Sequence, residues 1–101
     1  MTQQPEALLP TLEFWPDYGR GPLWAEGQWS DPVALGIPAV LAEDLSAWNA
    51  KYEEHALPIT GAGDPDFIAE GVQLLAGTRR ALAGRYRIVT TEPWWGEPPS
   101  E

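Results

Sequence analysis

The sequence predicts an α+β fold, in which two antiparallel helices pack on a small sheet in the order strand, helix, helix, strand. Two segments, 38–55 and 65–83, repeat apolar residues at helical spacing, and short alternating segments flank them at 12–15 and 85–91. A hydrophobic content of 44% is too high for a disordered chain, although eleven prolines and ten glycines shorten every element. We therefore expect a folded centre with long irregular loops rich in tryptophan, proline and glycine.

The chain length of 101 residues suits one domain with a single core. We place this domain at residues 12–92. Residues 1–11 are polar and contain prolines, which predicts a flexible arm, and residues 93–101 form a tail rich in proline and tryptophan. Regular structure is expected only between these two ends.

The first strand is predicted at 12–15, where Leu-Glu-Phe-Trp alternates and Pro16 then ends the strand. Residues 17–22 have turn chemistry throughout, which suits either a hairpin or an open loop. The connector 25–38 has room for one short strand and holds Trp29 as its one large anchor. We expect the connector to lie on the surface.

The turn carries the first candidate site, because Asp17 and Tyr18 lie between Trp15 and Trp24 in a frame of proline and glycine. A buried tyrosine needs a partner for its hydroxyl, and Asp17 or a nearby backbone carbonyl could supply one. We favour this structural clasp. The alternative is an aromatic, acid-tipped loop that receives a lysine or arginine of a partner protein.

The first helix is predicted at 38–55, with Pro38 at the first helical position. Its core stripe has spacings of 4, 3 and 4 residues and comprises Leu41, Leu45, Trp48 and Tyr52. The opposite side is a ridge of small residues closed by acids and comprises Glu43, Ala47, Ala50 and Glu54. A solvated helix back is the favoured interpretation of this ridge, and a docking surface is the alternative.

The second helix has clear signals at both ends. Asp64 suits the N-cap, Pro65 suits the first helical position, and Gly84 follows the predicted end at Ala83. Gly71 lies within the apolar face, where glycine costs about 1 kcal/mol relative to alanine. We therefore expect a bulky residue of the first helix, Trp48 or Tyr52, to approach it closely.

The last strand is predicted at 85–91, with Tyr86, Ile88 and Thr90 on one face, and it can pair with 12–15. Trp94 and Trp95 follow it. Adjacent tryptophans after a strand cannot both face inwards, so at least one should be an edge cap or a contact residue.

Motifs for catalysis or metal binding are weak. His55 is the one histidine, and a position at a helix end explains it better than a role as a general base. Asp64, Asp66 and Glu70 suit a helix start better than a cation site, and there are no cysteines. A carboxylate-only hydrolase that uses Asp17 with Glu13 or Glu26 is the least improbable enzyme. We expect no enzyme, no metal and no cofactor.

The charge is −9 and unevenly distributed. Residues 1–78 hold twelve acids against Arg20 and Lys51, and the next four bases form a basic corner that comprises Arg79, Arg80, Arg85 and Arg87. An acidic field repels nucleic acid and anionic lipid and attracts basic protein. The start of the chain lacks the pattern of a signal peptide, and no apolar run approaches the ~20 residues that span a bilayer. We expect a cytoplasmic protein that binds neither nucleic acid nor membrane.

A set of short motifs carries a resemblance. They are Phe14-Trp15-Pro16-Asp17-Tyr18-Gly19, Pro22-Leu23-Trp24, Leu45-x-x-Trp48-Asn49-x-x-Tyr52, Phe67-x-x-Glu70-Gly71-x-x-Leu74 and Tyr86-x-Ile88. Over roughly residues 12–91 the chain resembles small acidic proteins of actinobacteria, some of which resemble immunity proteins that neutralise a toxin. The resemblance implies a size and a fold layout, and it transfers no functional residues. The tail with Trp94 and Trp95 departs from the set.

Two functional hypotheses follow. The first is a non-enzymatic protein-binding protein of immunity or inhibitor type, a monomer or weak dimer, whose acidic aromatic surface covers a basic protein such as a nuclease-like toxin. Its partner-binding residues are predicted to be Asp17, Tyr18, Trp24, Trp29, Glu43, Glu54, Trp94 and Trp95. The alternative is a small-ligand or peptide-binding module with a cleft lined by Trp15, Trp24 and Trp29.

Overall fold

The computed structural model describes residues 9–53, 56 and 63–90, and it shows a mixed α+β fold with a four-stranded sheet and three helices. The predicted fold class is confirmed. The elements in chain order are β1 (Thr11–Phe14), β2 (Leu23–Ala25), β3 (Gln28–Trp29), α1 (Pro32–Leu35), α2 (Ala39–Ala50), α3 (Pro65–Ala81) and β4 (Arg87–Val89). The order is thus richer than strand, helix, helix, strand, because the connector at 25–38 adds regular structure.

The connector contributes a hairpin and one helical turn. β2 and β3 pair antiparallel across the two-residue turn Glu26-Gly27, in which both φ angles are positive, at 52° and 81°. Two positive φ values are what a type I′ hairpin turn needs, and asparagine or aspartate usually takes the first position. Glutamate in that position hides the hairpin from pattern analysis.

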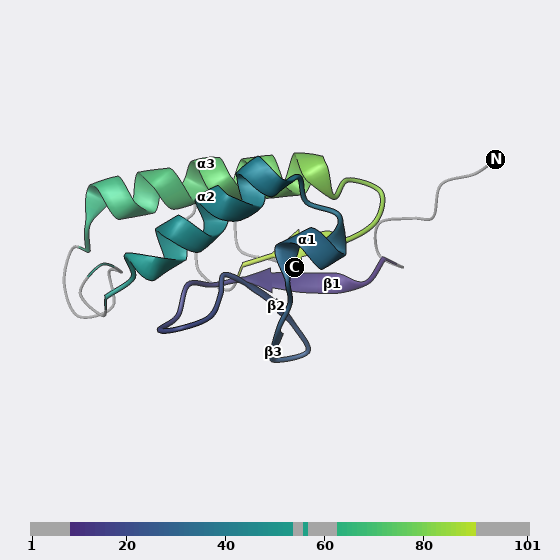
Figure 1. Ribbon diagram of the computed structural model, residues 1–101, viewed down its shortest axis with the longest axis horizontal. Helices are drawn as coiled ribbons and strands as arrows, with labels where there is room; N and C mark the ends of the chain where they lie inside the picture. Colours follow the sequence, from purple (N-terminus) through teal and green to yellow (C-terminus); the bar gives the residue numbers. More distant parts are fainter. Residues whose placement is uncertain (1–8, 54–55, 57–62, 91–101) are drawn as a thin grey trace.

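The sheet has the strand order β3-β2-β1-β4. β1 lies at its centre, antiparallel to β2 and parallel to β4, so the predicted pairing of the first and last strands is confirmed. The chain between β1 and β4 crosses one face of the sheet and returns to the end of the sheet where β1 began, so the two strands run in the same direction. In that passage α2 and α3 lie antiparallel and side by side over the sheet (Figure 1).

The core lies between this helix pair and the inner face of the sheet. Leu12, Phe14 and Ile88 point inwards from β1 and β4 and are almost fully buried. Trp48 of α2 is fully buried, with ring centroids 5.4 Å from Phe14 and 4.5 Å from Phe67. Its Nε1 donates to the carbonyl oxygen of Phe67 at 2.9 Å, which satisfies the one polar atom of the ring. The aromatic neighbour of Trp48 on α3 is therefore Phe67, one helical turn before Gly71.

The helix ends differ from the prediction in detail. Pro38 is the N-cap residue of α2 rather than its first helical residue, and α2 ends at Ala50 rather than near residue 55. The predicted N-cap of α3 is confirmed, because the Asp64 carboxylate accepts from the backbone N–H groups of Asp66 and Phe67 at 3.0 and 3.3 Å.

The basic corner has a structural role. Arg85 Nη2 donates to the carbonyl oxygen of Ala81 at 2.8 Å, at the end of α3, and Arg79 Nη2 donates to that of Ile88 at 2.5 Å. The backbone N–H of Arg87 donates to the carbonyl oxygen of Pro10 on the β1 side, so the carbonyl of the next residue, Ile88, points away from β1, where β4 is the edge of the described sheet. Arg79 therefore covers an edge carbonyl that could otherwise pair with another strand.

The predicted flexible arm lies almost wholly outside the described residues, as do the tail and three of the predicted site residues, Glu54, Trp94 and Trp95. Within the described part of the chain, none of the helices has the length and apolar character needed to cross a bilayer.

Candidate functional site

The loop between β1 and β2 is held by Asn49, a residue of α2 that the sequence analysis missed. Asn49 is 4% exposed, and its carboxamide bonds twice to the backbone of Asp17. Its Oδ1 accepts from the N–H of Asp17 at 3.0 Å, and its Nδ2 donates to the carbonyl oxygen of Asp17 at 3.0 Å. The loop is thus tethered by a side chain 32 residues away, and the predicted clasp, a buried Tyr18 held by its hydroxyl, is wrong because Tyr18 is exposed.

The same carboxamide explains a glycine in this loop. Gly21 has a φ of 149°, and a Cβ atom added there would lie 2.6 Å from Asn49 Oδ1. Real Cβ atoms do not approach so closely, and the φ value itself disfavours other residues. The position therefore needs glycine for Asn49 to reach Asp17.

Tyr18, predicted as a buried clasp or a contact residue, is 64% exposed. Its ring packs edge-on against Tyr52 just beyond α2, with the centroids 4.9 Å apart. The Asp17 carboxylate accepts from the backbone N–H of Tyr18 at 2.7 Å. The two residues therefore present an acid and an aromatic ring at the end of a tethered loop.

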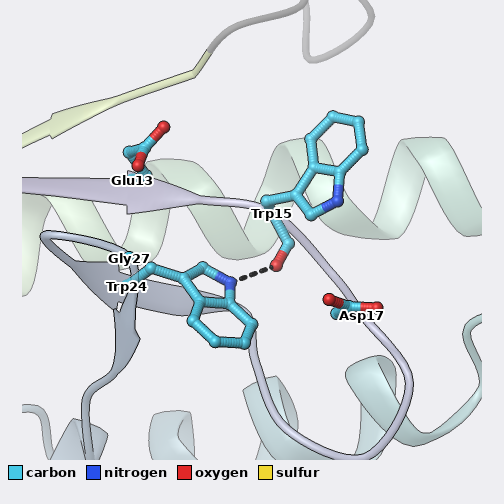
Figure 2. Close-up of a pocket in the computed structure, with 5 residues that line it drawn as sticks. All are labelled: Glu13, Trp15, Asp17, Trp24 and Gly27. Atoms are coloured by element: carbon cyan, nitrogen blue, oxygen red, sulfur yellow. Dashed lines mark hydrogen bonds between the residues drawn. The ribbon is translucent and has the colours of Figure 1, made fainter.

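A first cavity, the sheet cavity, lies beside the outer face of the sheet and measures about 270 Å³. It is lined by Glu13, Trp15, Asp17, Trp24 and Gly27 (Figure 2). Glu13 is exposed between the buried Leu12 and Phe14, so it projects from the face opposite the helices. Trp24 lies directly across from Glu13 in the β1–β2 ladder. The cavity therefore combines two carboxylates with two indoles.

The walls of the sheet cavity are fixed by hydrogen bonds. Trp24 Nε1 donates to the carbonyl oxygen of Trp15 at 2.7 Å, the bond drawn in Figure 2. The backbone N–H of Trp15 donates to the carbonyl oxygen of Pro22 at 2.7 Å, which closes the loop at its base. The Trp24 ring is thereby held in one orientation, and Asp17 is held by Asn49.

A second cavity, the helix cavity, measures about 290 Å³ and lies among β3, α1 and α2. Its lining is apolar and acidic and comprises Gly21, Trp29, Asp31, Pro32, Val33, Ala39, Ala42, Glu43 and Ser46. Asp31 is also the N-cap residue of α1, where it accepts from the N–H of Val33 at 3.1 Å. The guanidinium carbon of Arg20 lies 4.8 Å from the ring centroid of Trp29. This cavity therefore borders an indole that already contacts a cation.

The acids of both cavities lack basic partners among the described residues. In that part of the chain the one ion pair joins Lys51 to Glu70, with 2.5 Å between Nζ and Oε1. Arg79, Arg85 and Arg87 donate to carbonyl or hydroxyl oxygens. The carboxylates of Glu13 and Glu43 therefore remain available to an external cation.

The predicted site residues fall into separate groups. Asp17 and Trp24 line the sheet cavity, Trp29 and Glu43 line the helix cavity, and Tyr18 lies outside both. Of the three tryptophans predicted to line one cleft, Trp15 and Trp24 line the sheet cavity and Trp29 lines the helix cavity. Trp24 and Trp29 are nevertheless directly opposite in the β2–β3 ladder.

Asp31 and Asn49 were missed as site residues, and Glu13 was considered only as a catalytic partner of Asp17. Strand alternation already placed Glu13 opposite the core, so that signal was present. Asn49 had no comparable signal, because a polar residue beside Trp48 on a helix gives no indication of a partner 32 residues earlier.

No group of three or more histidine, cysteine, aspartate or glutamate residues among those described could hold a metal ion. Comparison with known protein families, with curated proteins and with solved structures gave no significant match.

Proposed function

We propose that this protein is a non-enzymatic protein-binding protein of immunity or inhibitor type, which uses the helix cavity to engage a basic protein partner. The observation that supports it most is the lining of that cavity by Trp29 and two acids, Asp31 and Glu43. Glu43 lies on α2 with Ala47 and Ala50, the described and exposed residues of the predicted ridge, and for these we adopt the docking alternative.

The composition of the cavity suits a protein interface. Protein interfaces have an apolar core enriched in aromatic residues and a polar rim. Here Pro32, Ala42 and the indole of Trp29 supply apolar surface, and Val33 beside them is 58% exposed. An exposed valine next to a tryptophan is surface that a partner can bury with a gain in free energy.

The charge of the partner follows from the acids. The net charge of −9 steers cations towards the protein and disfavours nucleic acid and anionic lipid. The contact of Arg20 with Trp29 shows within one chain that this indole accepts a guanidinium group. We propose a partner that presents arginine or lysine, a cytoplasmic setting and a monomer or weak dimer in the free state.

A small-ligand module has less support. The three tryptophans proposed for its cleft are divided between two cavities, and both volumes lie below the ~300–1,000 Å³ typical of small-molecule sites.

The test is co-expression with the products of the flanking genes, followed by purification at low salt and binding measurements on the complex. We expect a basic polypeptide in a 1:1 complex that dissociates as salt is raised. Glu43→Lys should weaken binding by about tenfold or more, because it reverses a contact charge. Glu53→Lys is the matched control, because Glu53 is exposed and lines neither cavity, while the substitution changes the net charge by the same amount. We expect it to weaken binding by less than twofold.

Two outcomes would refute the proposal. One is that no basic flanking-gene product is retained at low salt. The other is that Glu43→Lys and Glu53→Lys weaken binding equally, which would leave only a long-range effect of charge and no contact at the helix cavity.

A further inference from the structure

We infer that the sheet cavity is a second binding site, and that it takes the primary ammonium group of a lysine side chain. The inference deepens the proposed function, since that lysine would belong to the basic partner. The chemistry of the cavity can nevertheless be tested without the partner.

The lining selects a cation that carries N–H groups. Glu13 and Asp17 are acceptors only, and an ammonium group offers three donors for charge-assisted hydrogen bonds. A neutral ligand of the same shape would leave these carboxylates without a cation, and an anion would be repelled. A quaternary ammonium group could contact the indoles of Trp15 and Trp24, but it has no N–H to donate to the acids.

The size of the cavity favours one side chain over a larger ligand. Its volume of about 270 Å³ lies just below the range of small-molecule sites, ~300–1,000 Å³. The aliphatic stem of a lysine can pack along apolar surface while the charged end reaches polar groups. Gly27 at the turn between β2 and β3 has open space where a side chain would be, so it does not obstruct an extended ligand.

The site is organised before any ligand arrives. Trp24 is held by its hydrogen bond to Trp15, and the backbone of Asp17 is held by both hydrogen bonds of Asn49. Groups that are already ordered lose little conformational entropy on binding. A single side chain can therefore bind measurably, in the millimolar range expected for so small a ligand.

The experiment titrates the protein with Nα-acetyl-lysine methylamide and follows the indole N–H resonances by NMR, with the Trp24 signal assigned from Trp24→Phe. The comparison ligands are the Nε-acetylated and Nε-trimethylated analogues at the same ionic strength. We expect a saturable shift of the Trp24 signal with the lysine analogue. The acetylated analogue, which lacks the charge, and the trimethylated analogue, which lacks the N–H groups, should each bind at least threefold more weakly.

Variants then locate the site. Glu13→Gln and Asp17→Asn should each weaken binding of the lysine analogue at least threefold. Glu53→Gln, the same chemical change at an exposed position outside the cavity, should leave the binding unchanged. Because Glu13 and Asp17 are both exposed, these variants should fold, and near-ultraviolet circular dichroism checks that they do.

Equal binding of the acetylated or trimethylated analogue would overturn the inference, as would an unchanged affinity in Glu13→Gln and Asp17→Asn. Neither result would bear on the partner proposal, which depends on Glu43 in the other cavity. Conversely, selective lysine binding without any basic protein partner would support the sheet cavity and refute the proposed function.

Discussion

Replacement of Asn49 by alanine removes both hydrogen bonds between α2 and the loop at Asp17. Asn49 is 4% exposed, and the partners of its carboxamide are a backbone N–H and a backbone carbonyl, each 3.0 Å away. A polar group left unpaired in a part-buried setting costs about 1–3 kcal/mol. Two such groups, partly rescued by water because Asp17 is exposed, give an expected loss of about 2–3 kcal/mol.

The assay is urea unfolding followed by tryptophan fluorescence. We expect a lower midpoint with an unchanged m-value, since the same surface is exposed on unfolding. The melting temperature should fall by about 10–20 °C. Ser46→Ala is the control on the same helix: Ser46 is exposed and makes no described hydrogen bond, so its free energy of unfolding should change by less than about 0.5 kcal/mol.

Hydrogen exchange distinguishes loss of the Asn49 tether from a general loss of stability. In Asn49→Ala the Asp17 amide should exchange faster than the fall in global stability accounts for, because it loses its one described acceptor. The Trp48 indole N–H, bonded to Phe67 in the core, should follow global stability only. A loss below 0.5 kcal/mol together with unchanged exchange at Asp17 would refute the tether.

Three further predictions concern single positions. Gly21→Ala should lower the free energy of unfolding in urea by about 2–3 kcal/mol, because the new Cβ atom meets the side chain of Asn49. Gly19→Ala is the control, since Gly19 has a φ of 82° but open space around it, and it should cost only about 1 kcal/mol. Equal losses would argue against the close contact. Arg79→Ala should lower the free energy of unfolding by about 1 kcal/mol and increase self-association on size-exclusion chromatography, because it uncovers the Ile88 carbonyl. Arg80 is exposed, and Arg80→Ala should have neither effect. Lys51→Ala should change the free energy of unfolding by no more than about 0.5 kcal/mol despite the short contact between Lys51 and Glu70, because the two side chains are 57% and 42% exposed. A loss above about 1.5 kcal/mol would contradict this reasoning.

The helices were the most predictable part of the fold because their signals are local. Asp64 and Pro65 start α3 through bonds to residues two and three positions away, and the stripe of α2 places Leu45 and Trp48 in the core. The end of α2 was predicted about five residues too late. The four-residue spacing from Trp48 to Tyr52 is typical of a helix, but it does not require the backbone to stay helical up to Tyr52.

The hairpin β2–β3 was missed for a local reason of a different kind. Its turn puts Glu26 at positive φ, a conformation that costs energy for any residue with a Cβ atom. The pairing of Trp24 with Trp29 and of Ala25 with Gln28 offsets that cost. The identity of the turn residues alone therefore does not predict this hairpin, because the strand pairing that stabilises it depends on residues outside the turn.

Sequence alone determined the fold class, both long helices, the inward faces of β1 and β4, and the acidic field, because each depends on spacing along the chain or on summed charge. Tertiary structure decided which acids and tryptophans share a cavity. Glu13 and Trp24 become neighbours only through the β1–β2 register, and Asp17 is placed by Asn49 from 32 residues away. Such contacts depend on how the sheet and the helices pack. The sequence shows that there are six tryptophans, but only the packed structure shows that Trp15 and Trp24 line one cavity and Trp29 another.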